Sequence, residues 1–135
     1  MAHRQAVSGR VIAIGIGCRA GASAANIAAL VQRTLSHAQL DGASAQLFSI
    51  DTKRDEIGLI KAARLLAMPI AFLSRDALAA RASDAVTRSV RVAALHDLPS
   101  IAETAALAGA GPGSRLVLPR VSDGAVTCAV AIRER

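Results

Sequence analysis

The chain has 135 residues, of which 53% are hydrophobic and 19% charged, and a formal net charge of +6. This length and apolar content suit one domain (1–135) with a continuous core, which excludes intrinsic disorder, and no apolar stretch approaches the ~18 residues of a membrane span. Two cysteines, Cys18 and Cys128, are too few for a disulfide framework, so we expect a cytoplasmic protein.

The first part of the chain alternates predicted strands with predicted helices. The apolar run at residues 11–16 indicates a buried strand. Ser23 is placed to cap a helix, which Asp41-Gly42 ends. The apolar stripe of that helix has the spacing i, i+3, i+4, i+8 and consists of Ile27, Leu30, Val31 and Leu35. Residues 45–50 form a second predicted strand.

A second helix and a third strand follow. Thr52-Lys53-Arg54-Asp55 fits a capping box and predicts the start of a helix. The expected buried face of this helix is Ile60, Ala63 and Ala67. Pro69 ends the helix, and residues 70–73 are the third predicted strand. Ser74, with an acid two residues later, suits the start of a short helix over residues 77–82.

The last part of the chain contains a second capping box and a closing pair of strands. Residues 83–98 favour no single structure: a further helix, a strand near residues 90–94, or a loop. Ser100-Ile101-Ala102-Glu103 predicts an alanine-rich helix, which the glycines of residues 109–113 break. Two further strands are joined by a turn at Ser122-Asp123-Gly124, namely residues 116–118 and 125–132.

This order of elements predicts an α/β fold, a single three-layer α/β/α domain with helices on both faces of the sheet. The closing pair of strands is antiparallel, because parallel neighbours need a long crossover connection. The sheet is therefore mixed and mostly parallel.

The most informative segment follows the first predicted strand and contains Gly15, Gly17, Cys18, Arg19 and Gly21. Open α/β folds bind ligands at this edge of the sheet. The glycines allow close backbone approach, the next helix offers N–H groups to an anion, and Arg19 is a bidentate donor for carboxylate or phosphate. Glycines that serve only a tight turn explain the pattern equally well. Cys18 is either a nucleophile activated by the helix or, as we prefer, a small buried residue.

A second polar cluster follows the second predicted strand. Acids at a first helical turn often only complement the helix dipole. Six consecutive polar residues exceed that need, which favours a functional role for Asp51, Lys53 and Glu56. If the first two strands are parallel neighbours, this cluster and Arg19 share one edge of the sheet. Glu103, by contrast, is explained by its place in a capping box.

Several classes of partner are not expected. The only aromatic residues are Phe48 and Phe72, so a platform for stacking nucleic-acid bases is missing, and the basic residues are spread along the chain. No set of His, Cys and carboxylate residues has the spacing of metal ligands. We therefore predict no metal, no cofactor, no nucleic acid and no membrane partner.

Five segments in chain order carry a family pattern: Gly15-Ile16-Gly17-Cys18-Arg19-Ala20-Gly21, Ile50-Asp51-Thr52-Lys53-Arg54-Asp55-Glu56-Ile57-Gly58-Leu59, Ser100-Ile101-Ala102-Glu103-Thr104-Ala105-Ala106-Leu107, Leu116-Val117-Leu118-Pro119-Arg120 and Thr127-Cys128-Ala129-Val130-Ala131. Together they resemble the family of CobE proteins and the carboxyl-terminal domain of CbiG, both of cobalamin biosynthesis. Ile57 stands where the family usually has proline. Arg120 stands where it usually has lysine and keeps the positive charge.

The resemblance implies a three-layer fold and a role on tetrapyrrole intermediates, most closely that of a stand-alone CobE of the oxygen-dependent pathway. Precorrins are flat apolar macrocycles rimmed by carboxylates, for which Arg19, Lys53, Arg120 and helix N-termini are suitable partners. The implied ligand-binding set is Gly15, Gly17, Cys18, Arg19, Gly21, Asp51, Lys53, Ser100, Glu103 and Arg120. A precorrin or corrinoid intermediate is the expected partner, together with other enzymes of the pathway.

Three functions remain open. The first is a precorrin-binding protein. The second is a hydrolase that opens a lactone or acyl group on a precorrin, as CbiG-like proteins are associated with, using Glu56 or Asp55 as general base and Lys53 or backbone N–H groups at the oxyanion. The third is a small nucleotide-binding domain that uses the glycine loop and Asp51, although Asp51 lies farther along the chain than the dinucleotide fingerprint expects.

Overall fold

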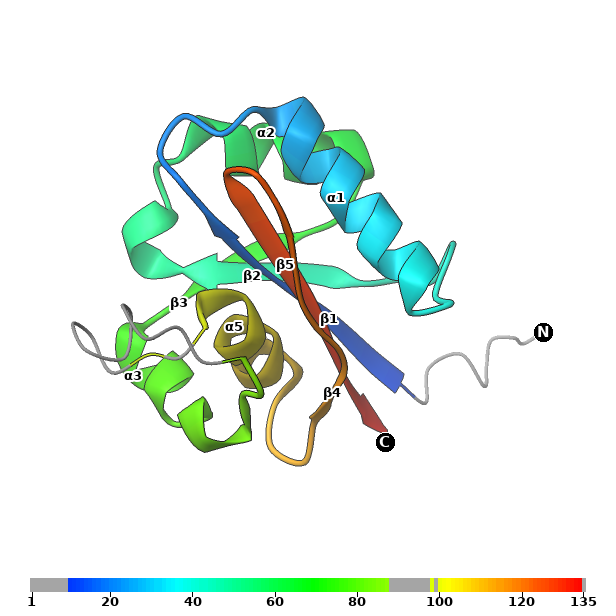
Figure 1. Ribbon diagram of the computed structural model, residues 1–135, viewed down its shortest axis with the longest axis vertical. Helices are drawn as coiled ribbons and strands as arrows, with labels where there is room; N and C mark the ends of the chain where they lie inside the picture. The colour runs from blue at the N-terminus through cyan, green and yellow to red at the C-terminus, as the bar shows by residue number, and fades with distance from the viewer. Residues whose placement is uncertain (1–9, 88–97, 99, 135) are drawn as a thin grey trace.

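The computed structural model describes residues 10–87, 98 and 100–134. A five-stranded sheet of order β3-β2-β1-β5-β4 lies between two layers of helices (Figure 1). The strands are β1 (Arg10–Cys18), β2 (Gln46–Ile50), β3 (Ile70–Leu73), β4 (Arg115–Asp123) and β5 (Val126–Glu134). The helices are α1 (Ala24–His37), α2 (Ile57–Leu66), α3 (Arg75–Ala79) and α5 (Ile101–Ala110), with 3-10 turns η2 (Asp51–Lys53) and η3 (Ala82–Asp84). Figure 1 shows α1 and α2 on one face of the sheet and α3 and α5 on the other, which confirms the predicted α/β fold.

The sheet is mixed, as predicted. β1 pairs with β2, and β2 with β3, in parallel, whereas β5 is antiparallel to both β1 and β4. Four strands therefore run in one direction and β5 runs in the other. The β4–β5 connection consists only of Gly124 and Ala125, and Gly124 has a φ of +62°. So short a connection joins antiparallel strands only, which confirms the predicted hairpin. Its turn lies at residues 124–125 and not at 122–124, because β4 extends to Asp123, well beyond the predicted 116–118.

The alternation of side chains along β1 divides the core between the two faces of the sheet. Ile12, Ile14 and Ile16 belong to the cluster packed beneath α1, where the predicted stripe of that helix is buried. Ala13 belongs to the opposite cluster, which packs against α5. Large side chains thus fill the space beneath α1, whereas small residues let α5 approach the sheet more closely.

Gly15 is where α5 comes closest to β1. A Cβ atom built on Gly15 would lie 1.9 Å from the carbonyl oxygen of Ala102 and 2.5 Å from the backbone nitrogen of Ala106. The backbones of the helix and the strand are therefore in direct contact, and Gly15 is required for packing rather than for a loop. α5 is apolar on most sides, but no helix in the described residues is long and apolar enough to cross a membrane.

β1 continues two residues beyond its predicted end at Ile16. Gly17 and Cys18 are therefore strand residues like Gly15, and β1 is paired with β5 over its full length. The loop between the first strand and the first helix is correspondingly shorter than predicted and consists of residues 19–23.

α1 begins as predicted and ends earlier. The Ser23 side chain caps its N-terminus. The helix ends at His37, and Gln39 then adopts a left-handed φ of +59°. This turn brings Leu40, which is only 9% exposed, into the core, so the burial of Leu40 ends the helix before Asp41-Gly42 is reached.

The predicted capping box at residues 52–55 is wrong. η2 occupies Asp51–Lys53, and α2 begins only at Ile57, with Glu56 as its N-cap. The first turn of α2 lies against the loop after β1, since a Cβ atom on Gly58 would lie 2.1 Å from a backbone oxygen of that loop. This contact, which no local pattern reveals, fixes where the helix starts.

α2 ends at Leu66, one residue before Ala67, which was predicted to lie on its buried face. Ala67 has a left-handed φ of +55° and terminates the helix ahead of Pro69. The buried face of α2 therefore consists of Leu59, Ala62 and Ala63. Ala63 was correctly predicted, Ile60 is only half-buried, and Ala67 is exposed.

β3 matches the predicted residues 70–73, and Ser74 caps α3 as predicted, although α3 begins at Arg75 and not at residue 77. Ser100 caps α5, and Gly111, with a φ of +98°, ends it within the predicted glycine stretch. Most of the segment 83–98, including the candidate strand at residues 90–94, lies outside the described residues.

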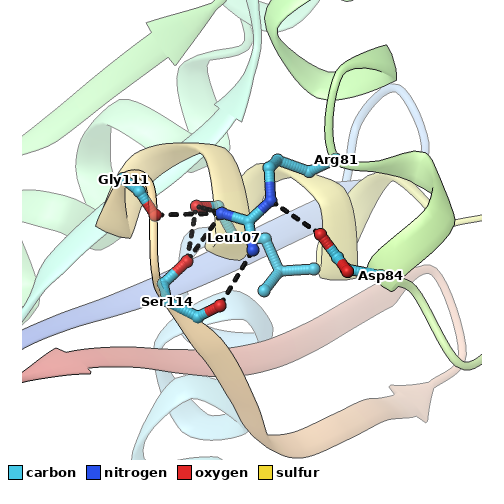
Figure 2. Close-up of polar contacts among 5 residues, drawn as sticks. All are labelled: Arg81, Asp84, Leu107, Gly111 and Ser114. Carbon is cyan, nitrogen blue, oxygen red and sulfur yellow. Dashed lines mark hydrogen bonds and ion pairs between the residues drawn. The ribbon is translucent and has the colours of Figure 1, made fainter.

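Arg81 caps the C-terminus of α5, a role that the sequence analysis missed. Its guanidinium donates to the carbonyl oxygens of Leu107 and Gly111 at 2.9 Å, to both oxygens of Ser114 at 2.8 Å, and to Asp84 at 3.0 Å (Figure 2). A cation here satisfies carbonyl groups that have no partner within the helix. Arg81 therefore holds the segment after α3 against the end of α5.

We predict that Gly15→Ala destabilises the protein by about 3 kcal/mol or more, because the added methyl group meets backbone atoms that no rotamer change can move. Gly113→Ala is the control. Gly113 has a φ of +86° but open space around its Cβ position, so the cost there is only about 1 kcal/mol of backbone strain. Urea unfolding of the two variants measures both values, and equal costs would contradict the close contact between α5 and β1.

Candidate functional site

The loop after β1 and the segment after β2 meet at the carboxyl end of the sheet. The backbone N–H of Gly21 donates to Oε2 of Glu56 at 2.9 Å. The buried hydroxyl of Ser49 also donates to the carbonyl oxygen of Ile16 at 2.7 Å, which ties the ends of the two parallel strands together. The prediction that these stretches share one edge is therefore confirmed. We call this edge the rim: residues 17–23 and 51–56. We include Arg120, because its backbone N–H binds Glu103 in the first turn of α5, which lies beside Gly17.

A pocket of about 400 Å3 opens at the rim between the N-termini of α1 and α2. Its lining comes from both stretches and from the first residues of α1 and α2, namely Gly21, Ala22, Ser23, Ala24, Asp55, Glu56, Ile57, Gly58 and Lys61. Ile57 is 65% exposed at the start of α2. The pocket thus combines backbone N–H groups and charged side chains with an exposed apolar residue.

The charged residues after β2 differ in their surroundings. Lys53 Nζ lies 4.0 Å from Glu56 Oε1, and both side chains are largely shielded, at 26% and 17% exposure. Asp51 pairs loosely with the exposed Arg54 at 3.8 Å, and Asp55 is exposed. Within the predicted polar cluster, water therefore screens the charges of Lys53 and Glu56 least. Their electrostatic interactions with a nearby charge are accordingly the strongest in the cluster.

Cys18 lies half-buried at the end of β1. Burial raises the pKa of its thiol; Lys53 nearby lowers the pKa and Glu56 raises it, and the net effect is upward. The thiol therefore ionises less readily than a free cysteine, which supports the small-residue interpretation over an activated nucleophile. Cys128 is fully buried in β5, and this burial raises its pKa to about 12.

Two further elements reach the rim. The N-terminus of α5 lies beside Gly17, whose Cβ position is 3.8 Å from Cβ of Ile101. The backbone N–H of Arg19 donates to the carbonyl oxygen of Ala125 in the β4–β5 turn at 2.9 Å. Arg19 itself is exposed.

Glu103 is a buried carboxylate beneath the rim, with no exposed surface. Oε1 accepts from the N–H groups of Val86 and Thr87, both at 2.9 Å. Oε2 accepts from the Thr87 hydroxyl at 2.6 Å and from the N–H of Arg120 at 2.8 Å. Burial raises the pKa of Glu103, but these four hydrogen bonds outweigh it and hold the pKa below its usual value.

These contacts change the predicted role of Glu103. Ser100 Oγ does accept from the Glu103 N–H, so half of the capping box is confirmed. The Glu103 carboxylate binds mainly outside the box, since the four bonds above involve both of its oxygens. The ligand contacts that the resemblance implies for Ser100 and Glu103 have almost no accessible surface, since the two residues are 3% and 0% exposed. A sequence signal did exist: Glu103 is the one charged residue of α5, whose other residues are apolar apart from Thr104.

Arg120 lies on the irregular part of β4. Its neighbours Leu118 and Val121 pair with β5 through shifted registers, so the chain bulges between them. Arg120 is exposed, and only its backbone is held by Glu103. Within the residues that the structure describes, no group of three or more His, Cys, Asp or Glu side chains is arranged to hold a metal ion.

Residues 12–131 match the family model described as the cobalamin synthesis G C-terminus. The chain is similar to protein CobE from Sinorhizobium sp, at 31% identity over 92% of this chain and 81% of that protein. It is also similar to the crystal structure of CobE, a protein from the cobalamin (vitamin B12) biosynthetic pathway, with a TM-score of 0.78, 37% identity, and coverage of 91% of this chain and 90% of that one.

A shorter similarity links the chain to the cobalt-precorrin-5A hydrolase of Priestia megaterium. The two are 42% identical over 55 residues, which is 40% of this chain and only 15% of the hydrolase. The chain therefore spans a small part of that enzyme's length.

We predict that Glu103→Gln destabilises the fold at neutral pH by about 2 kcal/mol, since it weakens hydrogen bonds to a buried charge. Because the folded-state pKa of Glu103 is lowered, its stabilisation is present above the unfolded-state pKa of about 4.3 and is lost as pH falls through the lower folded-state value. Urea unfolding between pH 7 and pH 3 should show the two proteins converging towards acid pH. A constant difference would contradict the role of the ionised carboxylate.

Proposed function

Since this chain belongs to the CobE/CbiG carboxyl-terminal family and is a cobalamin biosynthesis protein, we propose that it binds a precorrin intermediate at the rim. The observation that carries the proposal is the hydrogen bond between Gly21 and Glu56, which joins the two polar stretches around one pocket. The proposed partner is the tetrapyrrole; docking onto other enzymes of the pathway stays a prediction.

The rim suits the chemistry of a precorrin. The precorrin carries acetate and propionate groups around its periphery, and the rim offers cations on three separate segments: Arg19 after β1, Lys53 after β2, and Arg120 on β4. Two arginines provide planar donors for carboxylates, and the shielded Lys53 provides a charge of low screening. The exposed Ile57 at the pocket edge offers an apolar contact for the face of the macrocycle.

Hydrolysis of a precorrin is the second candidate, and the local similarity to the hydrolase favours it. Glu56 is the better placed general base, because it lies within the pocket and its Oε1 is only loosely paired with Lys53 at 4.0 Å. Its Oε2 is occupied by the Gly21 N–H, so one oxygen holds the loop while the other faces Lys53. Asp55 is exposed at the same pocket and is the weaker alternative.

We predict that Arg19→Ala, Lys53→Ala and Arg120→Ala each weaken the binding of a precorrin carboxylate about tenfold, the effect of losing one charge-assisted hydrogen bond. Binding is measured by the visible absorbance of uroporphyrin, a stable macrocycle rimmed by acetate and propionate groups, and of a purified corrin precursor. Affinity should also fall as salt is raised.

Arg64→Ala is the matched control for charge. Arg64 is exposed in the last turn of α2, away from the rim, and its loss changes the net charge equally. Equal weakening by Arg64→Ala and the rim variants would contradict a localised site. Binding of ATP in place of both macrocycles would favour the nucleotide-binding alternative.

For the hydrolase candidate, we predict that Glu56→Gln lowers turnover at least ~100-fold, the usual contribution of a general base, while macrocycle binding persists. The reaction is followed by mass spectrometry of a corrin lactone incubated with catalytic amounts of protein. Turnover unaffected by this substitution removes Glu56 as the base, and an unchanged substrate mass with wild-type protein favours binding alone.

A further inference from the structure

We infer that Glu103 is a positioning residue of the rim that acts through Arg120, an inference that rests on the proposed function. Glu103 does not reach the ligand itself, because it is fully buried. It lies in the first turn of α5 and binds two other segments at once, the backbone at residues 86–87 and the backbone of Arg120. Its carboxylate therefore fixes where Arg120 leaves β4.

The sheet alone does not hold Arg120 in place. Leu118 pairs with Val130, and the next pair is Val121 with Cys128, so the regular pairing of β4 skips the two residues between. The first of these is Pro119, which has no N–H to donate. The N–H of Arg120 is instead bound by Oε2 of Glu103 at 2.8 Å. The position of this backbone thus depends on a side chain from another element.

A carboxylate suits this position because, among the described residues, the four groups that bind it are all donors. With Glu103→Gln, the amide oxygen can keep the N–H groups of Val86 and Thr87, and the Thr87 hydroxyl can rotate to accept from the amide nitrogen. The N–H of Arg120 cannot rotate, so it would face another N–H. This substitution therefore releases Arg120 selectively and preserves most of the remaining contacts.

Arg81 provides a control at the other end of α5. Both Arg81 and Glu103 bind the segment between α3 and residue 87 to α5 through charged hydrogen bonds. Arg81 binds at the C-terminus of the helix (Figure 2), whereas the opposite end of α5 lies beside Gly17 of the rim. Arg81→Lys should therefore lower stability, since lysine lacks the planar donor fork, without changing the rim.

The experiment compares uroporphyrin binding by the wild type, Glu103→Gln, Arg120→Ala, the double variant and Arg81→Lys, with thermal unfolding measured for each. We expect Glu103→Gln to weaken binding about tenfold and Arg81→Lys to leave it unchanged. In the double variant, Glu103→Gln should add little to the loss caused by Arg120→Ala, because both changes remove the same contact. Fully additive losses, or equal losses for Glu103→Gln and Arg81→Lys, would overturn the inference.

Amide hydrogen exchange tests the same inference without a ligand. In Glu103→Gln, the amide of Arg120 should exchange faster while the amide of Val86 stays protected. In the wild type, the Arg120 amide resonance should shift as Glu103 is protonated at acid pH. This titration tests the inference even if the variant fails to fold. Unchanged exchange and an unshifted resonance overturn the inference. If the wild type binds no macrocycle, the proposed function fails, and the exchange data still decide whether Glu103 positions Arg120.

Discussion

The direct contact between the backbones of α5 and β1 determines the geometry of the whole molecule. Because Gly15 lacks a side chain, the first turn of α5 lies on the strand itself. The N-terminus of the helix then reaches the end of β1, and its C-terminus reaches Arg81 and the start of β4. A bulkier residue at position 15 would push α5 away from β1 and shift both ends of the helix. One small residue therefore fixes the distance between the second helical layer and the sheet.

Carboxylates serve mainly to hold loops at the carboxyl end of the sheet. Glu56 binds the N–H of Gly21, and Glu103 binds the N–H of Arg120. In both cases a charged acceptor joins segments far apart in the sequence, at a place where strand pairing or helix bonding no longer does so. Because backbone donors neutralise part of each negative charge, the acids can lie close to cations that we propose contact an anionic ligand.

The sequence predicted the strands, the layers and the meeting of two polar stretches, because each has a local pattern. The run at residues 11–16, the stripe of α1 and the glycine break after α5 reflect periodicity and backbone preference within a few residues. The start of α2 and the role of Glu103 could not be predicted in this way. Both depend on contacts across the fold, from Gly58 to the loop after β1 and from Glu103 to residues on two other segments.

The bulge of β4 also affects how the sheet presents itself to other molecules. β4 and β3 are the two edges of the sheet, where unpaired backbone groups can recruit a strand from another chain. In β4, the shifted registers, a proline and exposed arginines interrupt the row of unpaired backbone groups. β3 offers only a short row, because it is four residues long. The irregularity that places Arg120 at the surface therefore also protects an aliphatic, alanine-rich protein against edge-to-edge aggregation.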